Sequence, residues 1–191
     1  MLFVRSDSCK GSTGMSKQTA VDTEKPVLWT KKLFRHPKIG MMATIISVTL
    51  LIDQLSKVWA RQWLQSAGTQ VHFGGLLRFE HSENTGAFLS LFADLPEIYR
   101  KLILVVLVLV FLIGLAIFLI RQTNLPTIHV IGYSLLLSGG VGNIIDRIYK
   151  GSVTDFLWVG FEQLHTGIFN FADMFILLSI GLILIKARSP T

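Results

Sequence analysis

Two aspartates stand in apolar surroundings late in the chain, and neither has a basic residue beside it. Asp155 lies within Val-Thr-Asp-Phe-Leu-Trp, and Asp173 ends the run Phe-Asn-Phe-Ala-Asp, 18 residues later. Two carboxyl groups held close together in an apolar niche do not both ionise easily, so they share one proton. The ionised member can take a proton from water as that water attacks a peptide carbonyl, and the protonated member can protonate the leaving nitrogen. The pair therefore predicts aspartic-protease chemistry, which needs neither a metal nor a cofactor.

Each of these aspartates also has a simpler interpretation. Asn170 is expected to cap a helix that begins at residue 171, so that Asp173 falls in the first turn, where a carboxylate stabilises a helix. Asp155, taken alone, could be an exposed loop acid. If the two acids do meet, the helix N-terminus favours an ionised Asp173, and Asp155 is then the proton donor.

Other hydrolytic chemistries have weaker support. The chain has no His-Glu-x-x-His motif for zinc, and its single cysteine, Cys9, excludes an internal disulfide and a multi-cysteine metal cluster. Ser138 precedes a Gly-Gly pair and could be a serine nucleophile, but His129, the nearest histidine, is about two to three helical turns away. A serine in a glycine-rich stretch more often packs between helices.

Further charged and amide side chains lie within or beside the apolar segments. Asp53 and Lys57 are four residues apart on one helix face, as an ion pair that either stabilises its own helix or also anchors a neighbouring loop or the substrate. Asp146 is expected to be held ionised by the adjacent Arg147, which favours a structural role. The same helix face as Asp146 also carries Gly139, Gly142 and Asn143. The glycines on it would let a second helix approach closely.

The composition indicates that membrane helices position these groups. Hydrophobic residues make up 51% of the 191 residues and charged residues only 16%, against about 25% charged in an ordinary soluble domain. Four apolar segments are each close to the length that a helix needs to cross a bilayer. They span residues 41–60, 102–120, 128–145 and 171–185. The chain is therefore expected to fold as an all-α membrane protein, a bundle of four transmembrane helices.

The positions of the basic residues predict how that bundle is oriented. Lys38 precedes the first segment, Arg121 follows the second, and Lys186 follows the fourth, so the positive-inside rule places both termini in the cytoplasm. The connections 61–100 and 147–170 then lie outside, and both aspartates reach the outer surface. The net charge of +6 is thus an orientation signal with contacts to anionic lipids, and no nucleic-acid partner is expected.

The segments outside the apolar runs differ among themselves. Residues 70–80 mix β-forming residues around a Gly-Gly pair and predict a small hairpin, and residues 152–160 are typical of an extended strand. Residues 1–38 are rich in Ser, Thr and Lys and poor in aliphatic residues, which predicts a disordered basic cytoplasmic tail. No apolar run begins near Met1, so no signal peptide is expected, and Met15 is an alternative start.

Five short motifs resemble, in their order along the chain, those of the bacterial lipoprotein signal peptidases (signal peptidase II). They are Asp53-Gln-Leu-Ser-Lys57, Asn84-Thr-Gly-Ala-Phe88, Gly139-Gly-Val-Gly-Asn143-Ile-Ile-Asp146-Arg147, Val153-Thr-Asp-Phe156 and Phe169-Asn-Phe-Ala-Asp173. The resemblance spans about residues 39–188. It implies a peptidase of the bacterial inner membrane with a small periplasmic β-cradle and a short periplasmic helix. Such an enzyme removes the signal peptide of a prolipoprotein just before its diacylglyceryl-modified cysteine.

The resemblance also implies roles for individual residues. Asp155 and Asp173 would be the catalytic acids, and Gly86, in the Asn84–Phe88 turn, would let the outer loop approach the substrate closely. The supporting residues would be Asp53, Lys57, Asn84, Asn143, Asp146, Arg147 and Asn170. Diacylglyceryl-modified prolipoproteins and membrane lipids are the expected partners, and a monomer is the expected state.

Two other functions fit part of this pattern. A small proton-linked transporter would also carry acids in its membrane segments, but a conduction path should distribute them across the bilayer depth. Asp53, Asp146 and Asp173 instead all fall at the outer ends of their segments. A non-enzymatic assembly factor would bind lipidated proteins and would not depend on the two aspartates for binding.

Overall fold

The computed structural model describes residues 37–86, 96, 98–99, 102–122, 124–161 and 164–186. Most of the expected tail over residues 1–38, with Cys9 and Met15, lies outside these ranges, as does Phe88 of the second motif. The short periplasmic helix implied by the resemblance is not tested by the described residues.

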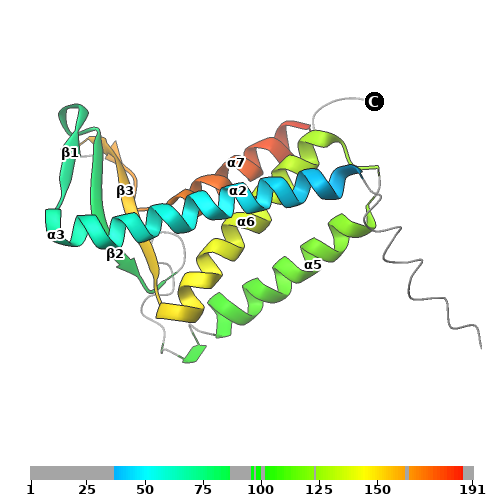
Figure 1. Ribbon diagram of the computed structural model, residues 1–191, viewed down its shortest axis with the longest axis horizontal. Coiled ribbons are helices and arrows are strands. Elements are labelled where there is room, and N and C mark those ends of the chain that lie inside the picture. Colours follow the sequence, from blue (N-terminus) through cyan, green and yellow to red (C-terminus); the bar gives the residue numbers. More distant parts are fainter. Residues whose placement is uncertain are drawn as a thin grey trace, which may run out of the picture.

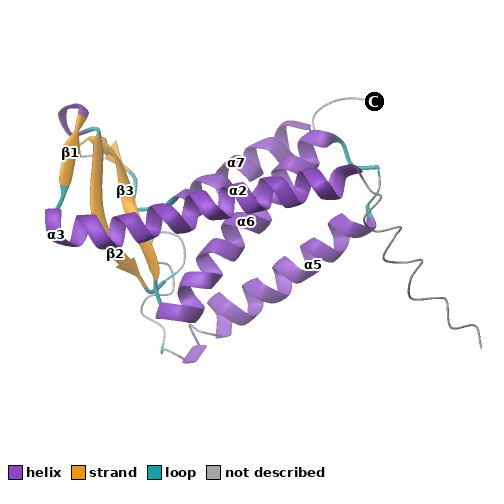
Figure 2. Cartoon of the chain, viewed as in Figure 1, coloured by secondary structure: helices purple, strands orange, loops and turns teal. Residues whose placement is uncertain are grey.

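The chain is mostly helical, with one small sheet at an end of the helical bundle (Figures 1 and 2). In chain order its elements are α2 (Pro37–Trp59), η1 (Ala60–Leu64), α3 (Gln65–Ala67), β1 (Gln70–His72), η2 (Phe73–Gly75), β2 (Leu77–Asn84), η4 (Leu102–Leu107), α5 (Val108–Arg121), α6 (Thr127–Lys150), β3 (Val153–Phe161), β4 (Leu164–His165) and α7 (Phe171–Lys186). The first helical run continues through η1 and α3 to Ala67, past its expected end at residue 60.

Three helical runs are long and apolar enough to cross a membrane, judged by length and composition. They span Lys38–Ala67, Leu102–Arg121 and Thr127–Lys150, and a shorter apolar helix spans Phe171–Leu184. Their large apolar side chains are widely exposed on the outside of the bundle, which is the distribution that a lipid environment favours. The last helix is therefore the one that length alone does not identify as a span.

Helix α6 is the centre of the bundle, and it packs against α2, α5 and α7. Three of its glycines each face a different neighbour. A Cβ added at Gly139 would lie 2.5 Å from the carbonyl oxygen of Ala172 in α7, and one at Gly140 would lie 2.7 Å from Leu112 in α5. One at Gly142 would collide with the carboxylate of Asp53 in α2. The expected close approach at this glycine-rich face is confirmed, because a side chain at Gly139 would meet the backbone of α7, and side chains at Gly140 and Gly142 would displace Leu112 and Asp53.

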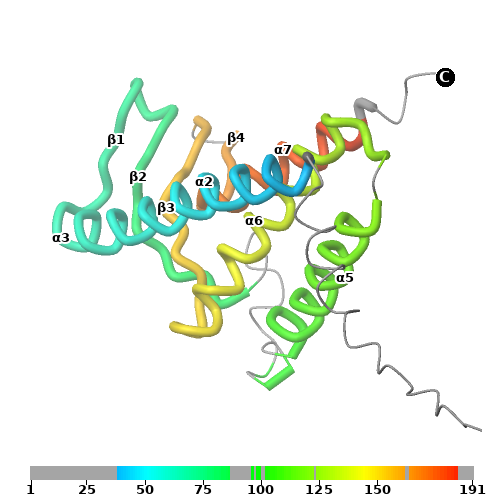
Figure 3. The backbone as a smooth tube through the Cα atoms, turned by 45° about the vertical axis from the view of Figure 1, so that its right-hand side comes forward, coloured from blue at the N-terminus to red at the C-terminus, as the bar shows by residue number. Residues whose placement is uncertain are grey.

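The sheet is antiparallel, with its strands in the order β1-β2-β3-β4. The expected hairpin is confirmed, because β1 pairs with β2 around a turn that contains two glycines with positive φ, Gly74 at 65° and Gly75 at 100°. The expected extended segment is also confirmed as β3, which pairs along β2 from Leu77↔Val159 to Asn84↔Val153. A buried cluster of Ala60, Leu64, Phe156 and Leu157 fixes the sheet to the end of the first helix. The tube in Figure 3 shows the sheet beside this end of the bundle.

Candidate active site

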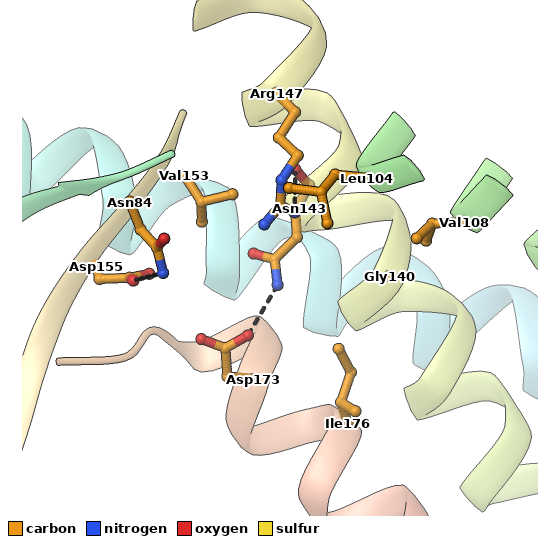
Figure 4. Close-up of a pocket in the computed structure, with 10 residues that line it drawn as sticks. All are labelled: Asn84, Leu104, Val108, Gly140, Asn143, Arg147, Val153, Asp155, Asp173 and Ile176. Carbon is orange, nitrogen blue, oxygen red and sulfur yellow. Dashed lines mark hydrogen bonds between the residues drawn. The ribbon is translucent and has the colours of Figure 1, made fainter. Parts of the chain in front are cut away.

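The two aspartates meet at the sheet end of the bundle, where β3, α6 and the start of α7 come together. Asp155 and Asp173 both line a cavity of about 160 Å³. Figure 4 shows the polar side chains of the lining gathered around the two acids. The other lining residues are Asn84, Asn143, Arg147, Leu104, Val108, Gly140, Val153 and Ile176. The cavity therefore joins a polar pocket with two acids to an apolar wall contributed by the helices.

Asp173 is positioned by the first turn of α7. The backbone N–H of Asp173 donates to Asn170 Oδ1 at 3.1 Å, and the backbone N–H of Asn170 donates to Asp173 Oδ2 at 3.3 Å. This reciprocal arrangement satisfies two backbone donors at the helix start, as a capping box does. Asp53 from α2 satisfies another, because its Oδ1 accepts from the backbone N–H of Ala172 at 3.0 Å. The expected Asn170 cap is confirmed, and Asp173 takes part in the cap and lines the cavity at once.

Asp155 is positioned by the β2–β3 ladder, where it pairs with Ser82. Only 2% of the residue is exposed, so the alternative of an exposed loop acid is wrong. Burial raises the pKa of Asp155 from its ordinary value of 3.8 to about 6, and the nearby Asp173 carboxyl raises it as well. Hydrogen bonds from the Asn84 and Asn170 amides act in the opposite direction. Asp155 therefore gains and loses its proton in the pH range where a catalytic acid is useful.

Three asparagine amides surround the acids, and each has its carbonyl oxygen occupied by another donor. Asn84 Oδ1 accepts from the backbone N–H of Gly86 at 2.9 Å, so its NH2 group donates to Asp155 Oδ2 at 2.9 Å. Asn170 Oδ1 accepts from the Asp173 N–H, so its NH2 group donates to Asp155 Oδ1 at 2.7 Å. Asn143 Oδ1 accepts from Lys57 Nζ at 3.0 Å, so its NH2 group donates to Asp173 Oδ1 at 2.9 Å. The orientation of all three amides is therefore determined by their partners, and each offers donors to an acid.

Lys57 is the buried cation of the site. Its side chain is fully buried, and its ammonium lies 2.9 Å from Asp53 Oδ2 and 3.5 Å from Asp146 Oδ2, in addition to its bond to Asn143. The expected Asp53–Lys57 ion pair is confirmed. The alternative that this pair also anchors neighbouring segments is supported as well. Lys57 donates to the side chain of Asn143 on α6, and Asp53 accepts from the backbone N–H of Ala172 at the start of α7.

Asp146 and its expected partner Arg147 attract each other, but the cations within 4.0 Å of the Asp146 carboxylate in the described residues are three others. That carboxylate lies near Lys57 and also 3.8 Å from Arg61 and 3.6 Å from Lys150, and it accepts from the backbone N–H of Thr154 at 3.2 Å. Adjacent residues on a helix point about 100° apart, so neighbours in the chain are not neighbours in space. Asp146 holds the end of α6 to the strand that carries Asp155, and this agrees with its expected structural role.

Arg147 points instead toward the acids. Its NH2 nitrogen donates to the carbonyl oxygen of Gly86 at 2.6 Å, and it lines the cavity. Gly86 is thereby held from two sides, by Arg147 and by the side chain of Asn84. The two aspartates thus do have a cation near them, which the sequence did not reveal because Arg147 adjoins neither in the chain.

The charged residues that sequence reasoning missed gather around the side chain of Thr154 on β3. Thr154 Oγ1 accepts from Arg61 at 3.0 Å and donates to Glu83 at 3.0 Å, and Lys150 also contacts its hydroxyl. Lys150 follows Asp146 by four residues, a spacing that could have identified this pair. Arg61 and Glu83 gave no comparable signal, because their contacts with Thr154 join residues far apart in the chain.

The serine alternative has no support in the site. Ser138 is buried, donates to the carbonyl oxygen of Leu135 at 3.0 Å and accepts from Thr49 Oγ1 at 2.7 Å. It is not among the residues that line the cavity. Its hydroxyl joins α2 to α6, which is the packing role expected of a small polar residue between helices.

Comparisons with known proteins agree with this site. A family model described as signal peptidase (SPase) II matches residues 45–188. A lipoprotein signal peptidase of Trichormus variabilis is 38% identical over 142 residues, which cover 74% of this chain and 84% of the relative. One of Clostridium tetani is 34% identical over 147 residues, covering 76% of this chain and 89% of the relative.

Solved structures of bacterial membrane enzymes have the same fold. One superposes with a TM-score of 0.69 at 25% identity, over 80% of this chain and 96% of the other. A second superposes with a TM-score of 0.67 at 24% identity, over 78% of this chain and 88% of the other.

Proposed function

The chain belongs to the signal peptidase II family, and from that membership we propose that Asp155 and Asp173 are the acids with which it cuts its substrates. Enzymes of this family are proteases that remove signal peptides from prolipoproteins, and this chain is one of them. The observation that carries the catalytic assignment is that the two acids, 18 residues apart in the chain, line one cavity and both accept hydrogen bonds from Asn170. Its side-chain NH2 group donates to Asp155 Oδ1, and its backbone N–H donates to Asp173 Oδ2.

The two acids divide the work of hydrolysis. Each acid accepts two N–H donors, but only Asp173 lies in the first turn of a helix, where the dipole favours a carboxylate, so Asp173 is the base that takes a proton from the attacking water. Asp155, whose pKa burial raises to about 6, is the acid that protonates the leaving nitrogen. Water adds to the peptide carbonyl, and the C–N bond breaks as the nitrogen receives its proton. Asp53, Lys57, Asn143 and Asn170 position these acids, and Asn84 and Arg147 border the space left for the peptide.

The site lies at the boundary between an apolar wall and a polar pocket, which suits a substrate that is partly dissolved in lipid. Leu104, Val108 and Ile176 form the apolar part of the lining. We assign to the enzyme cleavage just before a diacylglyceryl-modified cysteine, whose acyl chains would lie between the helices. A peptide bond deeper in lipid would lose hydrogen bonds at a cost of about several kcal/mol per unpaired group.

The protein acts as a multi-pass enzyme of the bacterial inner membrane. Lys38 and Arg121 lie at the end of the bundle opposite the sheet, which supports four crossings with both termini in the cytoplasm and the sheet on the periplasmic side. A monomer suffices, because one chain supplies both acids and all the amides named above. The transporter and assembly-factor alternatives are not supported by the family match.

The decisive experiment incubates the purified protein with a diacylglyceryl-modified prolipoprotein and follows release of the signal peptide. Asp155→Asn and Asp173→Asn should each abolish cleavage while the protein still folds and inserts. Glu80→Gln, which removes an acid from the same sheet but not from the cavity lining, is the matched control and should cleave normally. Near-normal processing by either aspartate variant would refute the assignment.

A further inference from the structure

The pairing register sorts the side chains of the sheet onto two faces. Residues directly opposite each other in an antiparallel ladder share a face, and successive residues alternate. Phe79 pairs with Leu157, and this face covers the bundle: the ring of Phe79 meets that of Trp59 edge-on at 5.9 Å, and Leu157 packs in the cluster with Ala60. We call this side the inner face.

The inner face continues past the helices that it covers. By the same alternation, Phe161 and Leu164 belong to the inner face, and they pair with each other where β3 meets β4. They are 60% and 85% exposed, so no helix lies against them. The β1–β2 turn lies at the same end of the sheet, because Leu77 pairs with Val159. Figures 1 and 3 show these turns standing to one side of the helix ends.

The β1–β2 turn adds a third exposed apolar side chain to this end of the sheet. Phe73 is 78% exposed and has a φ of 53°, a left-handed conformation that a bulky residue adopts only under constraint. We refer to Phe73, Phe161 and Leu164 together as the overhang.

The opposite face of the sheet is different in character. There the guanidinium of Arg78 lies 4.1 Å above the ring of Trp158, and the ring of His165 stacks on the same indole at 5.1 Å. His165 is the immediate neighbour of Leu164 in β4 but pairs with Gly160, so the two side chains point to opposite sides. Phe161 and Leu164 therefore extend the inner face with apolar side chains, whereas the opposite face carries Arg78, Trp158 and His165 together with the exposed Val71.

We propose that the overhang is a membrane-surface anchor, with its apolar side chains inserted at the boundary between lipid headgroups and acyl chains. The inner face is turned toward the membrane plane, because it covers the end of helices whose exposed apolar sides contact lipid. Where the sheet extends past those helices, lipid is what lies beneath it. Exposed Trp59 and Trp63 at the end of the first helix continue the same belt of interfacial aromatic residues.

A lipid surface fits the overhang better than a protein partner does. The three exposed apolar side chains are spread over two turns, and they are not among the residues that line the cavity. The anchor would hold the sheet, and with it Asp155 on β3, at a constant depth relative to the membrane. The inference rests on membrane embedding and on strand register, and it is independent of which residues perform the hydrolysis.

The test compares two adjacent positions with opposite orientation. In a Cys9→Ser background, Leu164→Cys and His165→Cys are each spin-labelled, and the protein is reconstituted into nanodiscs of phosphatidylethanolamine and phosphatidylglycerol. Collision rates with oxygen, which concentrates in lipid, and with a water-soluble nickel chelate then report the depth of each label. Phe161→Cys provides a second inner-face position, and retained signal-peptide cleavage shows that each labelled protein is folded.

The expected result is an oxygen-to-nickel collision ratio several-fold higher at positions 164 and 161 than at position 165. Removing the bilayer by transfer to an amphipathic polymer should abolish that difference. The proposal is overturned if all three labels collide mainly with the nickel chelate, which would place the overhang in water. It is also overturned if the labels at 164 and 161 are shielded from both reagents, which would indicate a protein contact.

Discussion

At the residue scale, Asn170 is shared by the helix start and by both acids. Its carbonyl oxygen accepts from the backbone of Asp173, and its NH2 group donates to Asp155. The amide cannot be flipped without losing both bonds, because the backbone N–H can only donate. The relative position of the two acids is thus set by a single side chain whose orientation is determined by the peptide backbone.

The cleavage activity should depend on which residue replaces Asn84. Asn84→Ala removes one hydrogen bond to Asp155, and we expect kcat to fall about tenfold or more, since a bond to a charged group contributes about 1.5–3 kcal/mol. Asn84→Asp keeps an acceptor for the Gly86 N–H but places a second carboxylate against Asp155. We expect a larger loss of kcat, and a pH–rate profile displaced to higher pH. Equal kcat and identical profiles for the two variants would contradict the amide's role as a donor.

The raised pKa of Asp155 should make part of the stability depend on pH. Because the folded protein holds this proton up to about pH 6 and the unfolded chain releases it near 3.8, unfolding becomes easier as the pH rises between those values. The stability of the natural protein relative to Asp155→Asn should therefore fall by about 2 kcal/mol from pH 4 to pH 7. Melting temperatures of both proteins across this range provide the measurement, and their difference cancels the titrating groups that do not interact with Asp155. A difference that is flat or that rises with pH would contradict the buried, protonated state.

The residue scale is also where sequence reasoning failed most clearly. The capping role of Asn170 and the Asp53–Lys57 pair depend on local spacing, and both were predictable. Of the partners of Asp146, Lys150 was predictable from its spacing of four residues, whereas Lys57 and Arg61 were not, because they lie far away in the first helical run. The burial of Asp155 likewise follows from its pairing with β2 and from no feature of its own segment.

At the element scale, the site depends on how closely α7 approaches α6. The first turn of α7 carries Asp173, and that turn lies against Gly139, where no side chain intervenes. Small residues at helix interfaces in membranes permit this contact between backbones. The position of Asp173 in the site therefore depends on Gly139 of α6, which has no side chain to keep α7 at a distance.

Gly139→Ala tests this dependence. The added methyl group would lie 2.5 Å from the backbone oxygen of Ala172, so the start of α7 must move. We expect a loss of about 1–3 kcal/mol in stability, together with reduced cleavage. Gly181→Ala, in the same helix α7 as Ala172, is the control, because a Cβ there meets nothing within 4 Å. Thermal unfolding and cleavage rates should be affected by the first substitution and not by the second, and equal effects would contradict the explanation.

Hairpin and strand formation were predictable from the sequence, whereas the length of the first helix was not. Two adjacent glycines among β-forming residues mark the β1–β2 turn, and both adopt positive φ there. The first helix continues to Ala67 because Ala60 and Leu64 are buried against the sheet, in the cluster with Phe156 and Leu157. That cluster forms between segments about a hundred residues apart, so hydropathy along one segment does not reveal it.

At the scale of the whole molecule, the conserved fold is separate from the N-terminal segment. The family model begins at residue 45, and the cavity is formed by residues from Asn84 to Ile176. Among the described residues, the hydrogen-bond partners of the two acids are Asn84, Asn143 and Asn170, all of which the family model covers. We therefore expect this segment to act, if at all, on orientation or on contacts with anionic lipid headgroups.

Deletion of residues 2–36 should leave catalysis unchanged. A shortened protein that keeps Met1 followed by Pro37 retains every element described here. Its kcat and KM for a diacylglyceryl-modified prolipoprotein should match those of the full chain when both are purified and reconstituted in the same lipid. A loss of kcat in the correctly folded shortened protein would show that the segment contributes to the site.

The capped start of α7 has a consequence for the order of events during synthesis. The segment that carries Asp173 leaves the ribosome after all the other elements of the site, because it is the last helix in the chain. Until that helix has been translated, the nascent protein contains one acid of the pair, and until its start is capped by Asn170 and Asp53 the second acid is not held in the site. The nascent chain is thus inactive until α7 is in place.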